Sequence, residues 1–351
     1  MNHSLEKICT QVQNNCHIAD ARHAADYTMC AYLLKMREYY RWELGYGFTD
    51  ALPKDPLGAW LEEREALWEM VEQADYSPIE ISGKTFDPFD TNGINQALEP
   101  FSLVYSAGLG LGGRAHFYLA ELLHKQAQDD VFTLYVSGKE YARCLTAPPA
   151  MASGHDVFLR KEALQRYLWE KYESWLWSRP DNALGRAFSH YDFATDPQAA
   201  VETMAATEMD AAKEHELGEY QAGLLLGEQW NQLVLDMALS PAELMARAVK
   251  DHLADALRTL PMLLQQRAVA SWHFYVGNLN GMRKHLFPEL VQAYQQWHET
   301  GDWTVLEAVV ATAANKWQTL AQEMLKVHQR LGVGAAETLR RKVLNKCGLE
   351  E

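Results

Sequence analysis

The chain has 351 residues, of which 48% are hydrophobic, and its formal net charge is −15. Such a length is enough for one large core or for two cores in contact. An acidic surface repels phosphate backbones and anionic lipid, so we exclude nucleic acid and membrane surfaces as expected partners.

The N-terminal segment and the cysteines bear on the location of the protein. The first residues form no apolar signal segment, and no stretch approaches the ~20 apolar residues of a membrane span, so no membrane insertion is expected. The five cysteines are odd in number, irregularly spaced and without a CxxC pair. We therefore expect reduced thiols and a cytoplasmic protein.

The first hundred residues are mainly helical by their pattern. The spacing of apolar residues predicts one long helix, or two, over residues 1–45, ended by Gly45 and Gly47. A further helix is predicted over 56–74, because Pro56 suits a first helical turn and an apolar stripe follows it. Turn signals then follow one another closely over 75–100, which predicts a domain boundary there.

Residues 101–160 are the only part of the sequence with strand character, because they contain apolar runs rich in β-branched and aromatic residues. The predicted elements are strands over 101–107, 131–136, 140–145 and 157–160, a turn at Ser137-Gly138-Lys139, and a helix over 114–128.

From residue 161 the pattern is helical to the end of the chain. The predicted helices cover 161–177, 199–238, 241–259, 262–280, 283–299, 303–331 and 335–346. The predicted fold is therefore mostly α, an orthogonal or bundle-like assembly of many helices with a small β-containing (α+β) insert near 101–160. We expect an N-terminal helical region (1–95), a small α+β insert (96–160) and a C-terminal helical domain (161–351) that packs with residues 1–75.

The strongest functional signal is a polar stripe on the predicted helix over 201–238. At 100° per residue, Glu208, His215 and Glu219 fall within about 20° of one line on the apolar face of this helix. Burying carboxylates without partners costs several kcal/mol, so something must compensate their charge. A metal ion does so directly, because carboxylates and neutral imidazole are common metal ligands.

Two alternatives to a metal remain open for this stripe. Arginine or lysine side chains from other helices would neutralise the carboxylates, or the face would line a wet crevice. The inward Glu and His side chains are similar in kind to those of di-iron carboxylate proteins, but the repeated ExxH motif of that class is missing.

A second polar stripe lies on the predicted N-terminal helix. Cys9, Cys16, His23 and Cys30 recur every seven residues, nearly two helical turns. Asp20 and His23 are the predicted ligand pair of this stripe, and His17 joins them if the helix is distorted. Buried free cysteines and a hydrogen-bonded histidine explain the same pattern without a ligand.

Two further motifs lie in the region around 101–128. Glu121 and His124 have the spacing by which one helix offers a carboxylate and an imidazole to one metal. The glycine-rich segment 108–113 lies between a predicted strand and a predicted helix, the context of a phosphate-binding loop, but its spacing departs from G-x-G-x-x-G.

These patterns lead to two hypotheses for the function. The first is a metal-binding helical protein, a non-haem iron or manganese oxidoreductase. Its ligands would be Glu208, His215 and Glu219, with Asp20 and His23 as further candidates. The second is a non-catalytic helical scaffold, or a protein that binds a small molecule or a protein partner.

Overall fold

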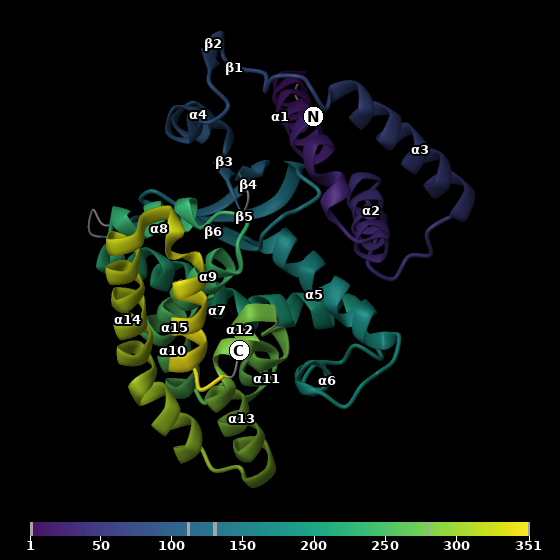
Figure 1. Cartoon of the computed structure of the whole chain (residues 1–351). Coiled ribbons are helices and arrows are strands. Elements are labelled where there is room, and N and C mark those ends of the chain that lie inside the picture. The colour runs from purple at the N-terminus through teal and green to yellow at the C-terminus, as the bar shows by residue number, and fades with distance from the viewer. Residues whose placement is uncertain (1–2, 111–112, 129–131, 280, 350–351) are drawn as a thin grey trace. The chain divides into compact units, whose positions relative to one another are not determined.

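The computed structural model describes residues 3–110, 113–128, 132–279 and 281–349 (Figure 1). The chain forms two compact units. The first contains Met1–Leu176 and Asp192–Ala205, and the second contains Trp177–Tyr191 and Ala206–Glu351. Each unit is described by itself below.

The first unit combines helices with two sheets. Its helices are α1 (His3–His23), α2 (Met29–Glu43), α3 (Lys54–Val71), α4 (Thr91–Leu98) and α5 (Lys161–Leu176), with 3₁₀ turns η1 (Ala24–Asp26) and η2 (Glu99–Phe101). Its strands are β1 (Ile79–Ile81), β2 (Lys84–Phe86), β3 (Leu103–Leu109), β4 (Ala115–Gln128), β5 (Phe132–Arg143), β6 (Ala150–Ser153) and β7 (Asp156–Arg160).

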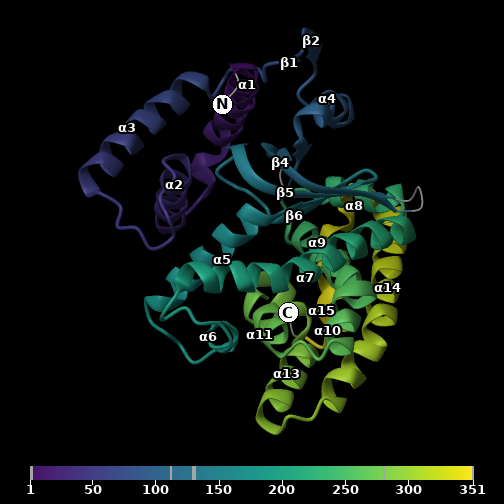
Figure 2. The ribbon, with the colours of Figure 1, turned by 180° about the vertical axis from the view of Figure 1, so that it is seen from behind.

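The larger sheet has the strand order β3-β4-β5-β7-β6, with β5 and β7 parallel and the other pairs antiparallel. Helix α1 packs on β4 and β5, and it also lies beside α3, as both views show (Figures 1 and 2). The apolar face of α1 places Val12 and Cys16 in one core with Tyr105, Phe117 and Leu119 of the sheet. The helical spacing of these α1 residues thus explains which face of the helix is buried.

The predicted helix over 114–128 is wrong, because this segment is strand β4. Its Ala, Leu, Glu and Gln residues favour a helix. However, β4 pairs with β3 as far along as Glu121, which lies opposite Leu103, and with β5 as far along as Gln128, which lies opposite Phe132. Pairing along both edges overrides the intrinsic preference. The expected ExxH geometry is therefore absent: His124 Nε2 lies 3.4 Å from the side-chain oxygen of Gln126.

The predicted turn at Ser137-Gly138-Lys139 is also wrong, because all three residues lie inside the single strand β5. Gly138 has a packing role there. A Cβ at this position would come within 2.7 Å of Glu121 Oε2 and 3.0 Å of Leu123 Cδ2. The glycine thus permits the side chains of β4 to approach the backbone of β5.

The predicted helix after segment 108–113 is wrong, because the described residues that follow the glycines form strand β4, the antiparallel neighbour of β3. Residues 111–112 of this segment lie outside the described residues.

The second unit is helical in its described residues. Its helices are α6 (Ala183–Phe188), α7 (Pro197–Leu226, whose first residues belong to the first unit), α8 (Glu228–Asp236), α9 (Pro241–Ala254), α10 (Leu260–Gln265), α11 (Val269–Asn278), α12 (Gly281–Leu286), α13 (Pro288–Thr300), α14 (Thr304–Leu331) and α15 (Ala336–Lys346), with a π-helical turn, η4 (Asp255–Thr259), and a 3₁₀ turn, η5 (Gly332–Ala335). Helix α14 lies along α9 and α15 in both views (Figures 1 and 2). Trp230, Trp272 and Trp317 are fully buried in this core.

The predicted helix over 199–238 is divided in the structure. Helix α7 ends at Leu226, and α8 begins at Glu228. Gly227 between them has φ +68°, a conformation that glycine adopts without steric cost and that a continuous helix does not allow. The three predicted ligands Glu208, His215 and Glu219 all lie on α7.

The fold class is mixed α+β, with 67% of the residues helical and a sizeable β part. The prediction of a mostly α protein with a small β insert underestimated the sheet, because β4 was expected to be a helix. Among the helices that the structure describes, none combines the length and the hydropathy that a membrane span requires.

Candidate ligand-binding site

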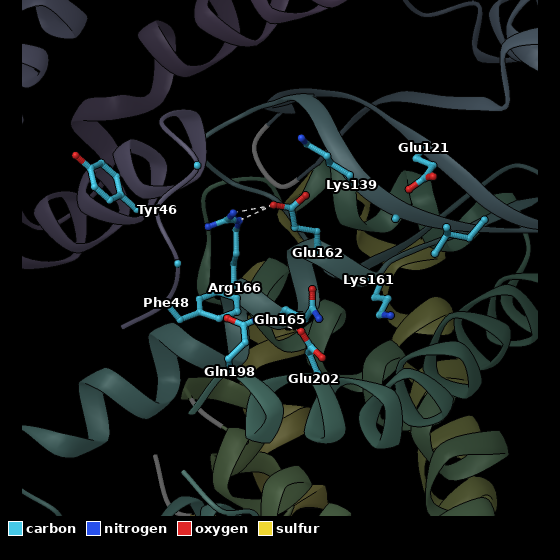
Figure 3. A pocket seen from close by; sticks show the side chains of 14 residues that line it. Tyr46, Phe48, Glu121, Lys139, Lys161, Glu162, Gln165, Arg166, Gln198 and Glu202 are labelled. Carbon is cyan, nitrogen blue, oxygen red and sulfur yellow. Dashed lines mark hydrogen bonds and ion pairs between the residues drawn. The ribbon is translucent and has the colours of Figure 1, made fainter. Parts of the chain in front are cut away.

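A cavity of about 520 Å³ lies in the first unit (Figure 3). Its walls come from the loop after α2, strands β4 and β5, helix α5 and the first turns of α7. Its charged lining residues are Glu121, Lys139, Lys161, Glu162, Arg166 and Glu202. The volume falls within the ~300–1,000 Å³ of small-molecule sites in proteins.

Local structure places three of these side chains at the cavity. Lys139 is the exposed residue between buried Gly138 and Glu140 in the alternation of β5. Glu162 and Arg166 stand four residues apart on α5, so that they share one face of this helix. The cavity therefore combines a strand lysine with an ion pair from a helix.

Arg166 is the most constrained of the charged side chains. Its Nε and Nη2 donate to Glu162 Oε1 over 3.1 and 2.7 Å, as Figure 3 shows. The residue is only 8% exposed, and its third nitrogen, Nη1, is buried with no acceptor among the described residues. Because a buried unsatisfied N–H is costly, an acceptor that reached this nitrogen would stabilise the wall of the cavity.

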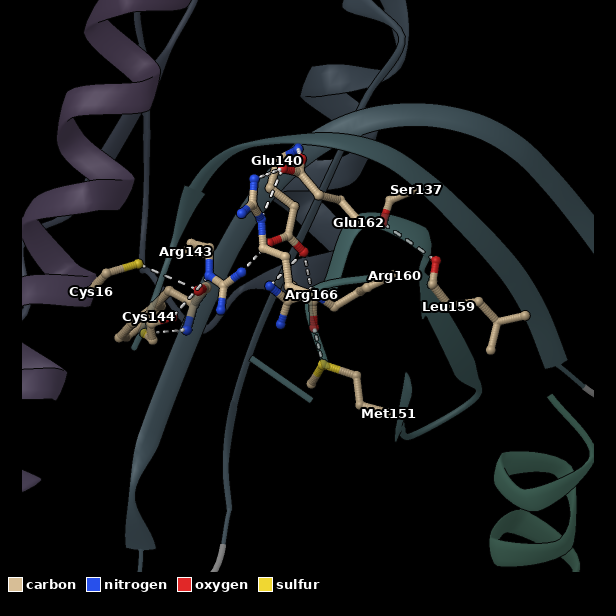
Figure 4. A network of polar contacts seen from close by, with 12 residues as sticks. Cys16, Ser137, Glu140, Arg143, Cys144, Met151, Leu159, Arg160, Glu162 and Arg166 are labelled. Atoms are coloured by element: carbon tan, nitrogen blue, oxygen red, sulfur yellow. Dashed lines mark hydrogen bonds and ion pairs between the residues drawn. The ribbon is translucent and has the colours of Figure 1, made fainter. Parts of the chain in front are cut away.

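A buried network of charges lies beside Arg166 (Figure 4). Arg160 donates from Nε to Glu140 Oε1 over 2.7 Å, and Arg143 Nη1 lies 3.6 Å from Glu140 Oε2. The backbone N–H of Glu140 donates to Glu162 Oε2 over 2.7 Å, which joins the network to the ion pair of Arg166. Three guanidinium groups thus share two carboxylates.

The buried position of Arg166 changes its pKa. Burial lowers the pKa, the Glu162 and Glu38 carboxylates oppose that effect, and the Arg143 guanidinium lowers the pKa further. Burial and the Arg143 guanidinium thus disfavour the charged form of Arg166 more than the carboxylates favour it. A negative group in the cavity would favour the charged form.

Two lysines add positive charge at the cavity. Lys139 and Lys161 are exposed, and neither has a carboxylate within ion-pair distance in the described part of the chain. Of the acidic lining residues, Glu162 is held by Arg166, and Glu202 accepts from Gln198 Nε2 over 2.9 Å. The arrangement favours binding of a small molecule with an anionic group.

Glu208 and Glu219, two of the predicted ligands, have protein partners in the second unit. Ser271 Oγ donates to Glu208 Oε1 over 2.7 Å, and burial raises the pKa of Glu208 to about 7 despite this hydrogen bond. Lys250 Nζ lies 2.5 Å from Glu219 Oε2. A hydroxyl therefore contacts Glu208 and an ammonium group contacts Glu219, whose second oxygen, Oε1, is buried without a hydrogen-bond donor among the described residues.

His215, the third predicted ligand of α7, belongs to a buried ion cluster. Its Nδ1 lies 2.8 Å from Asp255 Oδ1, and Asp255 also accepts hydrogen bonds from Tyr275 Oη (2.7 Å) and Arg283 Nη2. Asp255 begins the π-helical turn η4, and the Arg283 and His215 charges hold its pKa below the ordinary value despite burial. His215 is thus engaged by a carboxylate.

In the first unit, Asp20 and His23 each have a protein partner. The backbone N–H of Leu145 donates to Asp20 Oδ2 over 2.8 Å, and burial raises the pKa of Asp20 to about 7 against this hydrogen bond. His23 Nδ1 lies 3.2 Å from Asp26 Oδ2, at the end of α1.

His17 lies beside a cation. Arg64 Nη1 is 3.2 Å from His17 Nδ1, and Trp68 Nε1 donates to the same nitrogen over 3.4 Å. Burial and the Arg64 charge lower the pKa of His17 to about 3. The imidazole is therefore neutral and serves as a hydrogen-bond acceptor.

The predicted metal-dependent oxidoreductase is wrong. Within the described residues, no group of three or more His, Cys, Asp or Glu side chains is placed to hold a metal ion. For Glu219, the alternative of a cationic partner from another helix holds, because Lys250 forms an ion pair with its carboxylate. Iron or manganese as a cofactor stays an untested prediction.

Sequence reasoning did not single out Lys139, Lys161 or Arg166. One local signal was present, the four-residue spacing of Glu162 and Arg166. The other walls of the cavity come from segments far apart in the sequence, which no local pattern connects.

Close packing of α7 on α9 leads to a first testable prediction. A Cβ at Gly218 would overlap the carbonyl oxygen of Ala254, a backbone atom that does not move independently. We expect Gly218→Ala to lower the free energy of unfolding by about 1–3 kcal/mol. Denaturant unfolding followed by circular dichroism measures the change.

Gly223 in the same helix supplies a matched control, because a Cβ there meets nothing within 4 Å. Gly223→Ala is expected to raise the free energy of unfolding by about 0.5–1 kcal/mol, the usual gain from replacing a helical glycine. Equal stabilities of the Gly218→Ala variant and the wild type would contradict the close approach of the two helices.

Two family models match the chain. They are the N-terminal domain of a family of unknown function (DUF6866), over residues 7–160, and the C-terminal domain of the same family, over residues 165–346. No curated protein and no solved structure matches the chain.

Proposed function

This chain belongs to the DUF6866 family, a family of unknown function, and we propose that its first unit binds a small molecule carrying a carboxylate or phosphate group. One observation carries the proposal. Arg166 lies in the wall of a cavity of ligand size, is nine-tenths buried, and keeps one guanidinium nitrogen without an acceptor among the described residues.

The remaining lining supports the same ligand chemistry. Lys139 and Lys161 supply further positive charge, and Gln165 and Gln198 supply amide groups that donate or accept hydrogen bonds. Tyr46 and Phe48 add aromatic surface for an apolar part of the ligand. This proposal is a more specific form of the second hypothesis from the sequence, a protein that binds a small molecule. The cytoplasm remains the expected location of the protein.

Neutralising the two lysines tests the proposal. We expect the full-length protein at low ionic strength to bind citrate or inorganic phosphate saturably, measured by isothermal titration calorimetry. In the Lys139→Gln/Lys161→Gln variant the affinity is expected to fall at least about tenfold, because one lost charged hydrogen bond costs about 1.5–3 kcal/mol. Both lysines are exposed, so the fold is expected to be unaffected.

Two further variants provide a control and a test of the buried ion pair. Lys125→Gln removes an exposed lysine of β4 that pairs with Glu99 outside the cavity, and it is expected to bind as the wild type does. Glu162→Gln/Arg166→Gln removes both partners of the buried pair together and is expected to abolish binding. Absence of saturable binding of both probes to the wild type, or an equal loss in Lys125→Gln, would reject the proposal.

A further inference from the structure

A second cavity of about 430 Å³ lies in the first unit, apart from the residues of the proposed anion site. It is lined by the end of α1, the segment Ala24–Met29, the start of α2 and one face of α3. All of its lining residues belong to the first unit. The small side chains of Ala21, Ala24 and Ala25 leave the space open.

Aromatic side chains form much of the wall of this cavity. They are Tyr27, Tyr32 and Trp68, with Met29 beside them. Trp68 is fixed, because it is 4% exposed and donates from Nε1 to His17. Such rings present electron-rich faces, which attract organic cations and pack against methylene chains.

The charged residues of the lining are all acidic. Glu65, Glu69 and Glu72 follow one another at intervals of four and three residues, and therefore form one stripe on the face of α3 and at its end. At 1.5 Å per residue, the stripe extends over about 10 Å. No lysine or arginine is among the described residues that line this cavity.

The carboxylates of this stripe have few partners in the protein. Tyr32 Oη donates to Glu65 Oε1 over 2.9 Å, which joins the aromatic wall to the acidic one. Glu69 and Glu72 are exposed, and their carboxylates make no ion pair with any residue in the described ranges. Three carboxylates therefore line a cavity with aromatic walls.

The ring of Tyr27 already lies near cations of the chain itself. Lys35 Nζ is 5.7 Å and Arg114 Cζ is 5.8 Å from its centroid, and Arg114 is held in place by Asp26. Neither Lys35 nor Arg114 lines the cavity. The Tyr27 ring therefore already has cationic neighbours, whereas the rings of Tyr32 and Trp68 have none among the cations described.

We propose that this cavity binds a linear organic polyamine. Its ammonium groups pair with the carboxylates of Glu65, Glu69 and Glu72, and the methylene segments between them pack on the aromatic rings. A linear molecule fits the stripe because the carboxylates are spaced along a helix axis rather than gathered at one point. The site is opposite in charge to the cavity around Arg166 and does not depend on the function proposed for that cavity.

Calorimetric titration of the full-length protein with spermidine tests this inference. We expect saturable binding with one spermidine per chain at low ionic strength, weakened but still present at physiological ionic strength, because exposed charges are screened by salt. In Glu65→Gln/Glu69→Gln the affinity is expected to fall at least about tenfold. These residues are exposed, and glutamine keeps their shape, so the fold is preserved.

The matched control is Glu62→Gln/Glu63→Gln, which removes the same number of exposed charges from α3 outside the cavity. It is expected to bind spermidine within about twofold of the wild type. An equal loss in both double variants would show general attraction to an acidic surface and would overturn the proposal. No saturable binding to the wild type would do the same.

A neutral probe separates charge from apolar contact. The diol 1,8-octanediol has a methylene chain of similar length without ammonium groups, and no saturable binding of it is expected. Binding of the diol as tight as that of spermidine would identify an apolar groove and reject the polyamine site. Tyr32→Leu, with its fold checked by circular dichroism, is expected to weaken spermidine binding several-fold through the loss of the ring.

Discussion

Replacing Asp255 with asparagine is expected to lower the free energy of unfolding by about 3–5 kcal/mol, the usual effect of removing one partner of a buried ion pair. The Asp255 carboxylate is 1% exposed and accepts from His215, Tyr275 and Arg283. An amide keeps the size of the side chain but leaves the Arg283 guanidinium buried without its charged partner. Denaturant unfolding of the full-length chain measures the loss.

Asp251 supplies the matched control. It lies one helical turn before Asp255, is a third exposed at its side chain, and reaches the same guanidinium only at 3.8 Å, from Arg283 Nε to Asp251 Oδ2. Asp251→Asn is therefore expected to change the free energy of unfolding by less than about 1 kcal/mol. Similar losses in the two variants would show that the position on the helix, and not the buried pair, determines the effect.

The same cluster gives a dependence of stability on pH. Burial lowers the pKa of His215, but the Asp255 carboxylate outweighs this effect and raises it from 6.5 to about 9. The stabilisation from this pair is therefore complete below pH 6.5 and is lost as the pH rises through about 9. In Asp255→Asn, the free energy of unfolding is expected not to show this decrease between pH 6.5 and 9. A wild-type protein without this decrease would contradict the ion pair of His215 with Asp255.

The sequence was sufficient to predict the inward face of α7 but not the partners of its polar residues. Helical periodicity placed Glu208, His215 and Glu219 on the apolar side, and Glu208 is indeed buried. The compensating groups, including Asp255 and Lys250, lie on segments 31–40 residues further along the chain. Periodicity within one helix contains no information about which neighbour faces it, so a metal and a lysine were equally compatible with the stripe.

The sheet shows the corresponding limit for secondary structure. Strand β3 was predicted from an apolar run, but β4 was not predicted as a strand, because its composition favours a helix and only pairing with β3 and β5 determines the strand. In β5, the Ser-Gly-Lys sequence around Gly138 has a local preference for a turn. The structure uses the missing side chain for close packing of Glu121 and Leu123 instead.

The candidate site could not be predicted from local sequence patterns for a related reason. Glu140, Arg143 and Arg160 lie in or beside strands that were expected, but charged residues in a predicted strand are ordinarily assigned to its solvent face. Their burial results from mutual pairing across β5 and β7. Only the three-dimensional structure shows that three arginines share two carboxylates beside a cavity.

Glu140→Gln is expected to lower the free energy of unfolding by about 3–5 kcal/mol, because it removes a fully buried carboxylate from the centre of this network. The Glu140 side chain is 0% exposed and pairs with Arg160 over 2.7 Å. Without its charge, Arg160 and Arg143 remain buried beside Arg166 with one carboxylate among them. Denaturant unfolding monitored by circular dichroism measures this effect. The control, Glu121→Gln at an exposed position of β4, is expected to stay within about 0.5 kcal/mol of the wild type.

A double variant distinguishes the loss of a pair from a simple loss of packing. In Glu140→Met/Arg160→Met both charges are replaced by apolar side chains, and the free energy of unfolding is expected to exceed that of Glu140→Gln, since the guanidinium nearest to Glu140 is removed together with its partner. If the double variant is less stable than Glu140→Gln, the network stabilises the sheet through its hydrogen bonds rather than by balancing charge. In that case the excess positive charge beside Arg166 would no longer account for anion binding in the adjacent cavity.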